Sequence, residues 1–307
     1  MQSITTPDNL LFIITDRCNL RCSMCWYGKK KNAPAPSLWE QFLKDYPFHV
    51  FKNIYISGGE PLLTPNFRNI MDVLLEKGTN LRLSTNGTLI SRQTIRLMAG
   101  IQNISISLDG FQQTHERIRG VPGCYRRTLE AIDLLREYVP KADLSISTTL
   151  MPENVDEMSD FIDFLNLEKK ISVGIQPQVP AFYKNNSAHS ITMEGDTIKK
   201  MIDVFHTLIK RKDSQMAMDN DARYYRKCID YLEKNFAPIP GCQAGKKIIT
   251  LFPDGSTGVC WGLPGVKPHL QNTLRGKPLS GDFTRLIRRV NHRRCPGCLF
   301  YCYFFPE

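Results

Sequence analysis

Short apolar runs alternate with longer amphipathic segments along the first 180 residues. Runs of five to eight mostly apolar residues predict strands, whereas apolar residues that recur every three or four positions predict helices. The expected strands cover 9–15, 53–57, 81–85, 103–108, 143–150 and 171–176. One helix is expected to begin near Ser37, two more to cover 65–77 and 125–139, and a fourth to lie between the fifth and sixth strands. This alternation predicts an α/β fold with a parallel sheet and right-handed crossovers.

The pattern changes after Pro180. Residues 181–192 are polar and irregular, helical segments follow at about 194–212 and 222–235, and a second group of cysteines begins after Pro240. We therefore expect three parts, which are a large α/β domain at 1–190, a helical linker at 191–240 and a small C-terminal domain at 241–307.

Two motifs directly follow expected strands. Cys18, Cys22 and Cys25 come after the first strand, and Gly58-Gly59-Glu60-Pro61 ends the second. Three closely spaced thiolates can hold three irons of a 4Fe–4S cluster and leave the fourth iron open for chemistry. A structural zinc site needs four ligands, and the nearest further Cys or His after Cys25 is His49.

Together these motifs resemble those of the radical S-adenosylmethionine (SAM) superfamily. The resemblance implies a partial (β/α)6 barrel of the TIM type, with functional residues at the carboxyl ends of the strands. It also implies a 4Fe–4S cluster on the three cysteines and SAM held beside Gly58, Gly59, Glu60 and Pro61. One departure is Met24, because the residue before the third cysteine is usually aromatic in the family.

Further SAM contacts are implied by the SPASM-type subfamily, in which a strand-end Ser-x-Asp-Gly is followed by His and Arg-Gly. The matching residues are Ser107, Asp109, Gly110, His115, Arg119 and Gly120. Ser107 and Asp109 would serve the ribose, Arg119 the SAM carboxylate, and Gln176 the adenine. The alternative for the Ser107–Gly120 run is a capping turn with a surface ion pair. Residues 85–87 are either a SAM contact or a tight turn.

The C-terminal cysteines resemble the opening signature of SPASM and twitch domains, Cys-x(9–15)-Gly-x4-Cys around a β-hairpin. The shorter twitch form uses a pair of cysteines, a gap and Cys-x2-Cys. The residues that fit this form are Cys242, Cys260, Cys295 and Cys298, with Cys302 as a further candidate. The resemblance implies a second, auxiliary 4Fe–4S cluster, and the alternative is a four-cysteine zinc ribbon.

Cys124 and Cys228 belong to neither group. A free buried cysteine usually acts as a small hydrophobic residue. In a radical enzyme, a thiol can also return a hydrogen atom to the substrate, and Cys124 is the candidate for that role because it follows the Gly-rich segment 120–123.

Composition narrows the setting. The 307 residues contain no apolar run long enough to span a membrane and no signal peptide, and ten cysteines in such a chain favour metal ligation over disulfides. We therefore expect a cytoplasmic protein. The net charge of +10 indicates either solvated faces or a docking surface for an acidic electron donor such as flavodoxin or ferredoxin. No nucleic-acid-binding motif accompanies it.

The resemblance implies that SAM is cleaved reductively to a 5′-deoxyadenosyl radical, which removes a hydrogen atom from a substrate carbon. The favoured outcome is oxidation of a small sugar-like or natural-product substrate, with the auxiliary cluster accepting an electron. The alternatives are radical epimerisation, radical modification of a peptide, and a non-catalytic iron–sulfur or zinc protein. An early first strand, near Asn9, favours a small-molecule substrate over a peptide.

Overall fold

The computed structural model describes residues 7–25, 43, 46–65, 67–179, 195–213, 220–237, 240–253, 255, 257–258 and 260. Its strands are β1 (Asn9–Thr15), β2 (Asn53–Gly58), β3 (Asn80–Thr85), β4 (Asn103–Ser107), β5 (Asp143–Leu150), β6 (Ser172–Pro177), β7 (Ile248–Leu251) and β8 (Thr257–Gly258). Its α-helices are α2 (Phe67–Glu76), α3 (Gln112–Arg119), α4 (Cys124–Tyr138), α5 (Met158–Asp163), α6 (Gly195–Asp213) and α7 (Ala222–Glu233). The helix expected near Ser37 lies outside the described residues.

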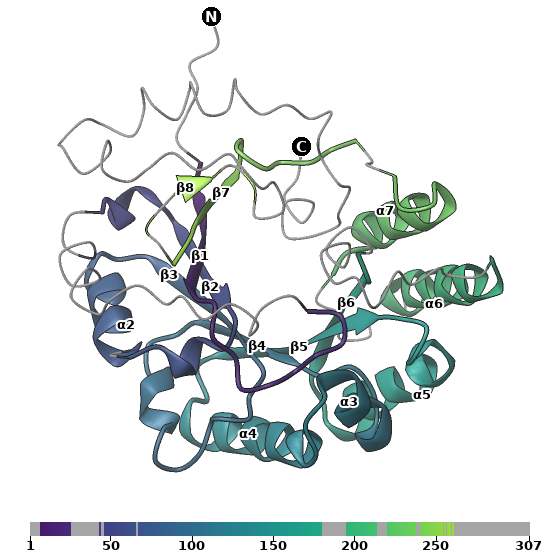
Figure 1. Cartoon of the computed structure of the whole chain (residues 1–307), viewed down its shortest axis with the longest axis horizontal. Coiled ribbons are helices and arrows are strands. Elements are labelled where there is room, and N and C mark those ends of the chain that lie inside the picture. The colour runs from purple at the N-terminus through teal and green to yellow at the C-terminus, as the bar shows by residue number, and fades with distance from the viewer. Residues whose placement is uncertain are drawn as a thin grey trace, which may run out of the picture.

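The strands form one curved sheet with the order β6-β5-β4-β3-β2-β1-β7-β8. Each neighbouring pair from β1 to β6 is parallel. Figure 1 shows the sheet bent into an open ring, with α2 to α7 around its outside. This arrangement confirms the predicted α/β partial barrel. The sequence pattern missed α3, whose eight residues are strongly polar.

The C-terminal hairpin joins the same sheet. Strand β7 pairs in parallel with β1, from Asn9 opposite Ile248 to Phe12 opposite Leu251. Strand β8 runs antiparallel to β7 after a turn in which the Gly255 N–H donates to the Phe252 carbonyl at 2.9 Å. The expected hairpin is therefore present, and it extends the barrel beyond β1.

The two faces of the sheet differ in polarity. On the outer face, apolar side chains such as Ile104, Ile106 and Val173 are fully buried under the helices. Phe205 of α6 and Tyr225 of α7 belong to this same core, so both helices cover the barrel. The inner face carries Ser105, Ser145 and Ser147 where a closed TIM barrel would place bulky branched residues. Strands β3 to β6 are thus apolar outside and polar inside, whereas β1 is buried along its whole length and carries apolar residues on both faces.

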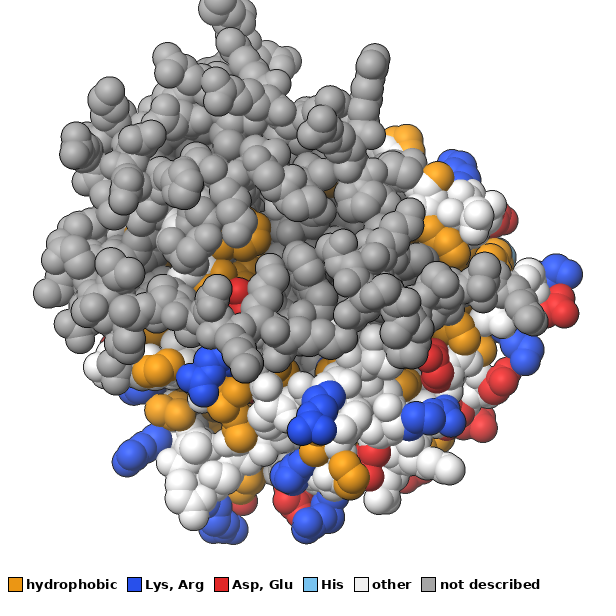
Figure 2. Space-filling model, in the orientation of Figure 1, with side chains coloured by type: hydrophobic (Ala, Val, Ile, Leu, Met, Phe, Trp, Pro, Cys, Tyr) orange, Lys and Arg blue, Asp and Glu red, His pale blue; other side chains and the backbone are white. Residues whose placement is uncertain are grey.

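The described surface mixes both signs of charge. Figure 2 shows Lys and Arg side chains interspersed with Asp and Glu over the described part of this face. Two basic stretches of the sequence, 29–31 and 285–294, lie outside the described residues. In a third, 210–212, Arg211 pairs with Asp163. Among the described helices, none has the length and apolar character needed to cross a membrane.

Candidate active site

The cysteine loop, residues 16–25, follows β1 and is held by backbone hydrogen bonds to α3. The backbone N–H of Arg21 donates to the Arg119 carbonyl at 3.0 Å, and that of Ser23 donates to the Ile118 carbonyl at 2.8 Å. These bonds tie the middle of the loop to the last turn of α3. Its three cysteines, Cys18, Cys22 and Cys25, are half-buried. The loop is therefore ordered by its neighbours while its thiols stay partly accessible.

The Gly-Gly-Glu-Pro motif touches the start of this loop through its backbone. The Gly59 N–H donates to the Thr15 carbonyl at 2.8 Å, and the Glu60 N–H donates to the Arg17 carbonyl at 2.7 Å. A Cβ added at Gly58 would lie 2.3 Å from the Thr15 oxygen, and one at Gly59 would lie 2.1 Å from the Arg17 oxygen. Both distances are far inside van der Waals contact, so the glycines allow β2 to meet the cysteine loop.

The Glu60 side chain links the ends of β2 and β3 from a fully buried position. Its carboxylate accepts hydrogen bonds from the Thr85 hydroxyl and the Asn86 N–H, both at 2.8 Å, and from the Leu62 N–H at 3.2 Å. Burial raises the pKa of this carboxyl group, and the hydrogen bonds oppose that shift. Both carboxylate oxygens are therefore used within the protein.

Asn86 carries this linkage to the cysteines. Its side-chain amide nitrogen lies 4.0 Å from the Cys18 sulfur and donates to the side-chain Oδ1 of Asn19 at 2.9 Å. Thr85 ends β3, and a turn begins at Gly87, whose carbonyl accepts the Ile90 N–H at 3.0 Å. Asn86 lies between the strand and this turn and contacts the cysteine loop.

Asp109 and Arg119 form a buried ion pair beside the loop. The Arg119 Nε donates to Asp109 Oδ2 at 2.6 Å, and Asp109 Oδ1 accepts the Thr149 N–H at 3.0 Å. Another guanidinium nitrogen of Arg119 lies 3.8 Å from the Cys22 sulfur. Burial would lower the pKa of Arg119, but the nearby Asp109 and Cys22 outweigh it and raise the pKa. The site therefore holds the guanidinium of this buried ion pair next to Cys22.

Several buried polar atoms of the described residues have no hydrogen-bond partner there, among them His115 Nε2 and the side-chain oxygen of Gln178. His115 accepts the Asp109 N–H on Nδ1 at 3.1 Å, whereas its Nε2 has no partner. Burial, and secondarily Arg119, lower the pKa of His115 to about 3, so the ring is neutral. The side-chain oxygen of Gln178, just after β6, is also unpartnered and buried. Buried polar groups normally have partners, and a cofactor could satisfy these two.

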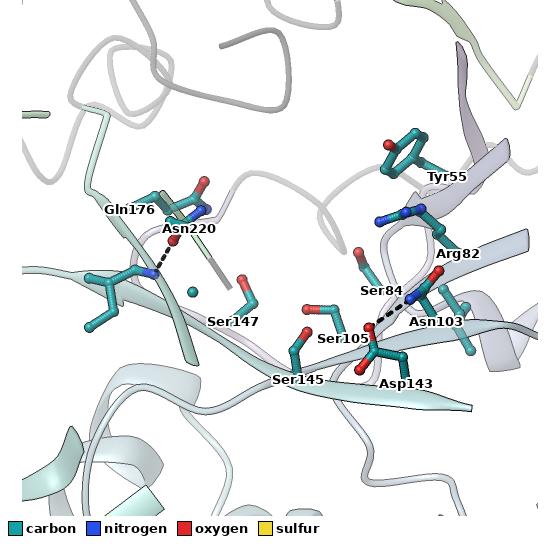
Figure 3. Close-up of a pocket in the computed structure, with 13 residues that line it drawn as sticks. Tyr55, Arg82, Ser84, Asn103, Ser105, Asp143, Ser145, Ser147, Gln176 and Asn220 are labelled. Atoms are coloured by element: carbon teal, nitrogen blue, oxygen red, sulfur yellow. Dashed lines mark hydrogen bonds between the residues drawn. The ribbon is translucent and has the colours of Figure 1, made fainter. Parts of the chain in front are cut away.

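A cavity occupies the inner face of β3 to β6, in the interior of the ring. Figure 3 shows Ser84, Ser105, Ser145 and Ser147 turned toward it, with Arg82 at one side and Gln176 at the other. The remaining lining residues are Tyr55, Leu83, Asn103, Asp143, Gly174, Ile175 and Asn220. Asn220 precedes α7 and accepts the Ile175 N–H at 2.7 Å.

Of the residues predicted as SAM contacts, Gln176 lines this cavity and Ser107 ends β4 on the same face. Cys124 and Cys228 are fully buried and do not line it. The serines and Gln178 were missed in the sequence interpretation. The strict alternation in Asn-Ile-Ser-Ile-Ser (103–107) was the available signal, because parallel strands buried on both faces are usually apolar throughout.

The described C-terminal cysteines lie at the other end of the barrel from the cysteine loop. Strand β8 runs antiparallel to β7 and ends at Gly258 opposite Thr250. Cys260 follows two residues later, in the direction of the start of β7, which is level with Asn9 at the start of β1. Cys242 precedes β7 at the same end, and both cysteines are half-buried. Cys295, Cys298 and Cys302 lie outside the described residues.

The cysteine loop fits a cluster better than a single ion. Within the described ranges, no three His, Cys, Asp or Glu side chains converge to hold one metal ion. Ligands of a 4Fe–4S cluster each bind a different iron, so they do not need to meet at one point. The residues that would hold the cluster are Cys18, Cys22 and Cys25, with Arg119 beside them.

Comparisons with known proteins support the interpretation of the cysteine loop as a cluster-binding loop. The family model for the radical SAM superfamily matches residues 12–165, half of the chain. The AdoMet-dependent heme synthase of Methanosarcina barkeri (strain Fusaro) is 28% identical over 264 residues, which are 83% of this chain and 74% of that protein. Sporulation killing factor maturation protein SkfB of Bacillus subtilis (strain 168) is 28% identical over 162 residues, 51% of this chain but only 39% of SkfB.

Solved structures share the fold. The structure of anSMEcpe with bound AdoMet has a TM-score of 0.65 at 17% identity, covering 84% of this chain and 75% of that one. Streptococcus suis SuiB bound to precursor peptide SuiA has a TM-score of 0.62 at 17% identity, covering 96% and 70%. With the motif geometry and the family match, these results show that the chain is a member of the radical SAM superfamily, whose enzymes use a 4Fe–4S cluster and SAM.

Proposed function

We propose that this enzyme oxidises a polar substrate bound inside the barrel. When bound, the cluster and SAM supply a 5′-deoxyadenosyl radical that removes a hydrogen atom from a substrate carbon. The observation that carries the proposal is the cavity lined by Ser105, Ser145 and Ser147, whose side chains make no hydrogen bond within the described part of the chain. These hydroxyl groups can donate to and accept from the hydroxyl groups of a sugar-like molecule.

The positions of the two cysteine groups favour oxidation over other radical outcomes. Strand β1 runs from Asn9, level with the start of β7, to Thr15, next to the cysteine loop. At about 3.3 Å per residue, the two ends are roughly 20 Å apart, and the cavity lies between them. A substrate in the cavity would lose a hydrogen atom at one end, then release one electron toward Cys242 and Cys260 and one proton to solvent. The net change is a two-electron oxidation.

This proposal includes an auxiliary cluster on Cys242, Cys260, Cys295 and Cys298, with Cys302 as a further candidate ligand. It also includes SAM contacts at the barrel end that carries Gly58, Gly59 and Arg119. An acidic flavodoxin or ferredoxin would supply the electron for SAM cleavage, consistent with the net charge of +10.

Modification of a peptide is the second candidate. Its support comes from relatives, since SkfB is named as a maturation protein and the antilisterial bacteriocin subtilosin biosynthesis protein AlbA of Bacillus subtilis (strain 168) is 31% identical over 140 residues. A peptide would place one polar side chain in the cavity, whereas a small molecule would enter whole.

The proposed function is tested first by SAM cleavage. Anaerobically prepared protein with dithionite and SAM should form 5′-deoxyadenosine, and the triple variant with Cys18, Cys22 and Cys25 changed to Ala should form none. Cys228→Ala is the matched control, because this thiol lies fully buried on α7 away from the cavity. Undiminished cleavage by the triple variant would refute the assignment.

The triple variant should still bind about four irons at the C-terminal cysteines, and zinc there instead would support the ribbon alternative.

A further inference from the structure

We infer that the substrate carries an anionic group, a carboxylate or a phosphate, which binds to the guanidinium of Arg82 at the floor of the cavity. The floor is the row of inward-facing residues Tyr55, Arg82, Asn103 and Asp143, which are consecutive register partners on β2 to β5. The inference rests on the proposed function, because it names the class of substrate that the cavity would take.

Arg82 differs from the paired arginines of this fold. The guanidinium lies 5.4 Å from the centroid of the Tyr55 ring, a cation–π arrangement that orients the side chain without neutralising it. No ion pair joins Arg82 to an acidic side chain in the described part of the chain. Some described arginines pair with Asp or Glu, namely Arg68, Arg119, Arg126, Arg211 and Arg223. Others, such as Arg92, do not, and Arg82 is distinguished by its position in the cavity lining.

Charge within the cavity points to an anion at Arg82. Among its described lining residues, Arg82 is the one cation and Asp143 the one anion. Asp143 is already engaged, because it accepts a hydrogen bond from the Asn103 amide at 2.9 Å. Arg82 therefore has guanidinium donors to offer. The planar fork of an arginine matches the oxygens of a carboxylate or phosphate.

Spacing along β3 leaves room for a substrate between Arg82 and the cysteine loop. Asn86, which contacts the Cys18 sulfur, is four residues beyond Arg82, or roughly 13 Å along the strand. Ser84 lies between them on the inner face (Figure 3). An acid bound at Arg82 would extend its hydroxyl-bearing part along the serines, with its far end toward the cysteine loop.

The test uses anaerobic protein with its clusters reconstituted and SAM bound. The probes are D-glucuronate, its neutral counterpart D-glucose, and inorganic phosphate, with binding measured by isothermal titration calorimetry. We expect D-glucuronate to bind at least about tenfold more tightly than D-glucose, and Arg82→Gln to remove that preference. Arg82→Lys should restore part of it, and Asp143→Asn should leave it unchanged or increase it.

Arg92→Gln is the matched control, because Arg92 also lies over a tyrosine ring, 5.9 Å from the centroid of Tyr138, but outside the cavity. It should not alter binding of any probe. The inference is overturned if neither D-glucuronate nor phosphate binds more tightly to the wild type than to Arg82→Gln.

The same preparations are assayed for 5′-deoxyadenosine, which separates the two failures. If the wild type cleaves SAM but Arg82→Gln binds both anions as tightly as the wild type, the substrate class is wrong and the proposed function stands. If the wild type does not cleave SAM, the proposed function itself fails.

Discussion

At the scale of single residues, the structure of the site depends on the buried ion pair between Arg119 and Asp109. The Asp109 side chain is fully buried and that of Arg119 is 10% exposed. Removing one partner of a buried pair leaves an uncompensated charge, which costs about 3–5 kcal/mol. We therefore expect Arg119→Gln to lower the free energy of unfolding by about 3 kcal/mol in urea titrations, since the Thr149 N–H still supports Asp109.

Arg126→Gln provides the control for this change, because Arg126 pairs with Glu130 on the helix surface and is 76% exposed. Exposed pairs contribute about 0–1 kcal/mol. Equal losses for the two variants would contradict a special role for the buried pair. A second readout is the midpoint potential of the N-terminal cluster, which should fall in Arg119→Gln because a positive hydrogen-bond donor is removed from the Cys22 sulfur.

His115 makes the stability of the fold depend on pH. Its pKa is lowered to about 3 in the folded chain, compared with about 6.5 when unfolded. The unfolded chain therefore binds more protons below pH 6.5, and stability falls as the pH drops from about 6.5 toward 3. Between pH 7 and pH 5 we expect a loss of about 2 kcal/mol from this residue.

His115→Asn isolates that contribution, because the Asn oxygen can accept the Asp109 N–H in place of Nδ1. The difference between wild type and variant, measured by urea unfolding at pH 7 and pH 5, should change by about 2 kcal/mol. His206→Asn, on α6, is the control. A difference that does not change with pH would show that His115 is not held neutral.

At the scale of elements, the approach of β2 to the cysteine loop depends on Gly59. Ala at this position would place its Cβ 2.1 Å from the Arg17 oxygen, so the two backbones must separate. We expect Gly59→Ala to reduce the iron bound by Cys18, Cys22 and Cys25 and to lower the melting temperature.

Gly195→Ala is the matched control, because Gly195 starts α6 with no atom within 4 Å of an added Cβ. It should keep full iron content and be neutral or slightly stabilising, since Ala favours helices. Normal iron content in Gly59→Ala would show that the close backbone contact is not needed for the cluster.

The six barrel strands were predictable from sequence because each is a local apolar run with turn residues after it. Strand β7 was predictable as part of a hairpin, but its pairing with β1 joins residues about 240 positions apart, and no local pattern encodes such a contact. Helix α3 was missed because its apolar positions are few, and the cysteine loop and the Gly120 turn hold it in place. Motif spacing located the cysteines, whereas the buried linkages of Glu60 and Asp109 required the fold.

At the scale of the whole molecule, the barrel separates two cysteine groups with a polar cavity between them. This arrangement predicts where hydrogen goes during turnover. In the proposed oxidation, an electron would pass toward Cys242 and Cys260, so the reacting carbon would gain no hydrogen from solvent. Epimerisation would instead need a thiol facing the cavity, and burial of Cys124 together with its absence from the cavity lining argues against that donor.

Turnover in deuterium oxide distinguishes these outcomes for any substrate that the enzyme accepts. We expect no deuterium at the reacting carbon and about one SAM consumed per product, by mass spectrometry of substrate and product. Burial raises the pKa of Cys124 to about 11, so its thiol stays protonated at neutral pH and would carry deuterium if it were the donor. Cys124→Ala should therefore leave the isotope content unchanged, as should Cys228→Ala. One deuterium at an inverted carbon, lost in Cys124→Ala but retained in Cys228→Ala, would make Cys124 the hydrogen donor and the reaction an epimerisation.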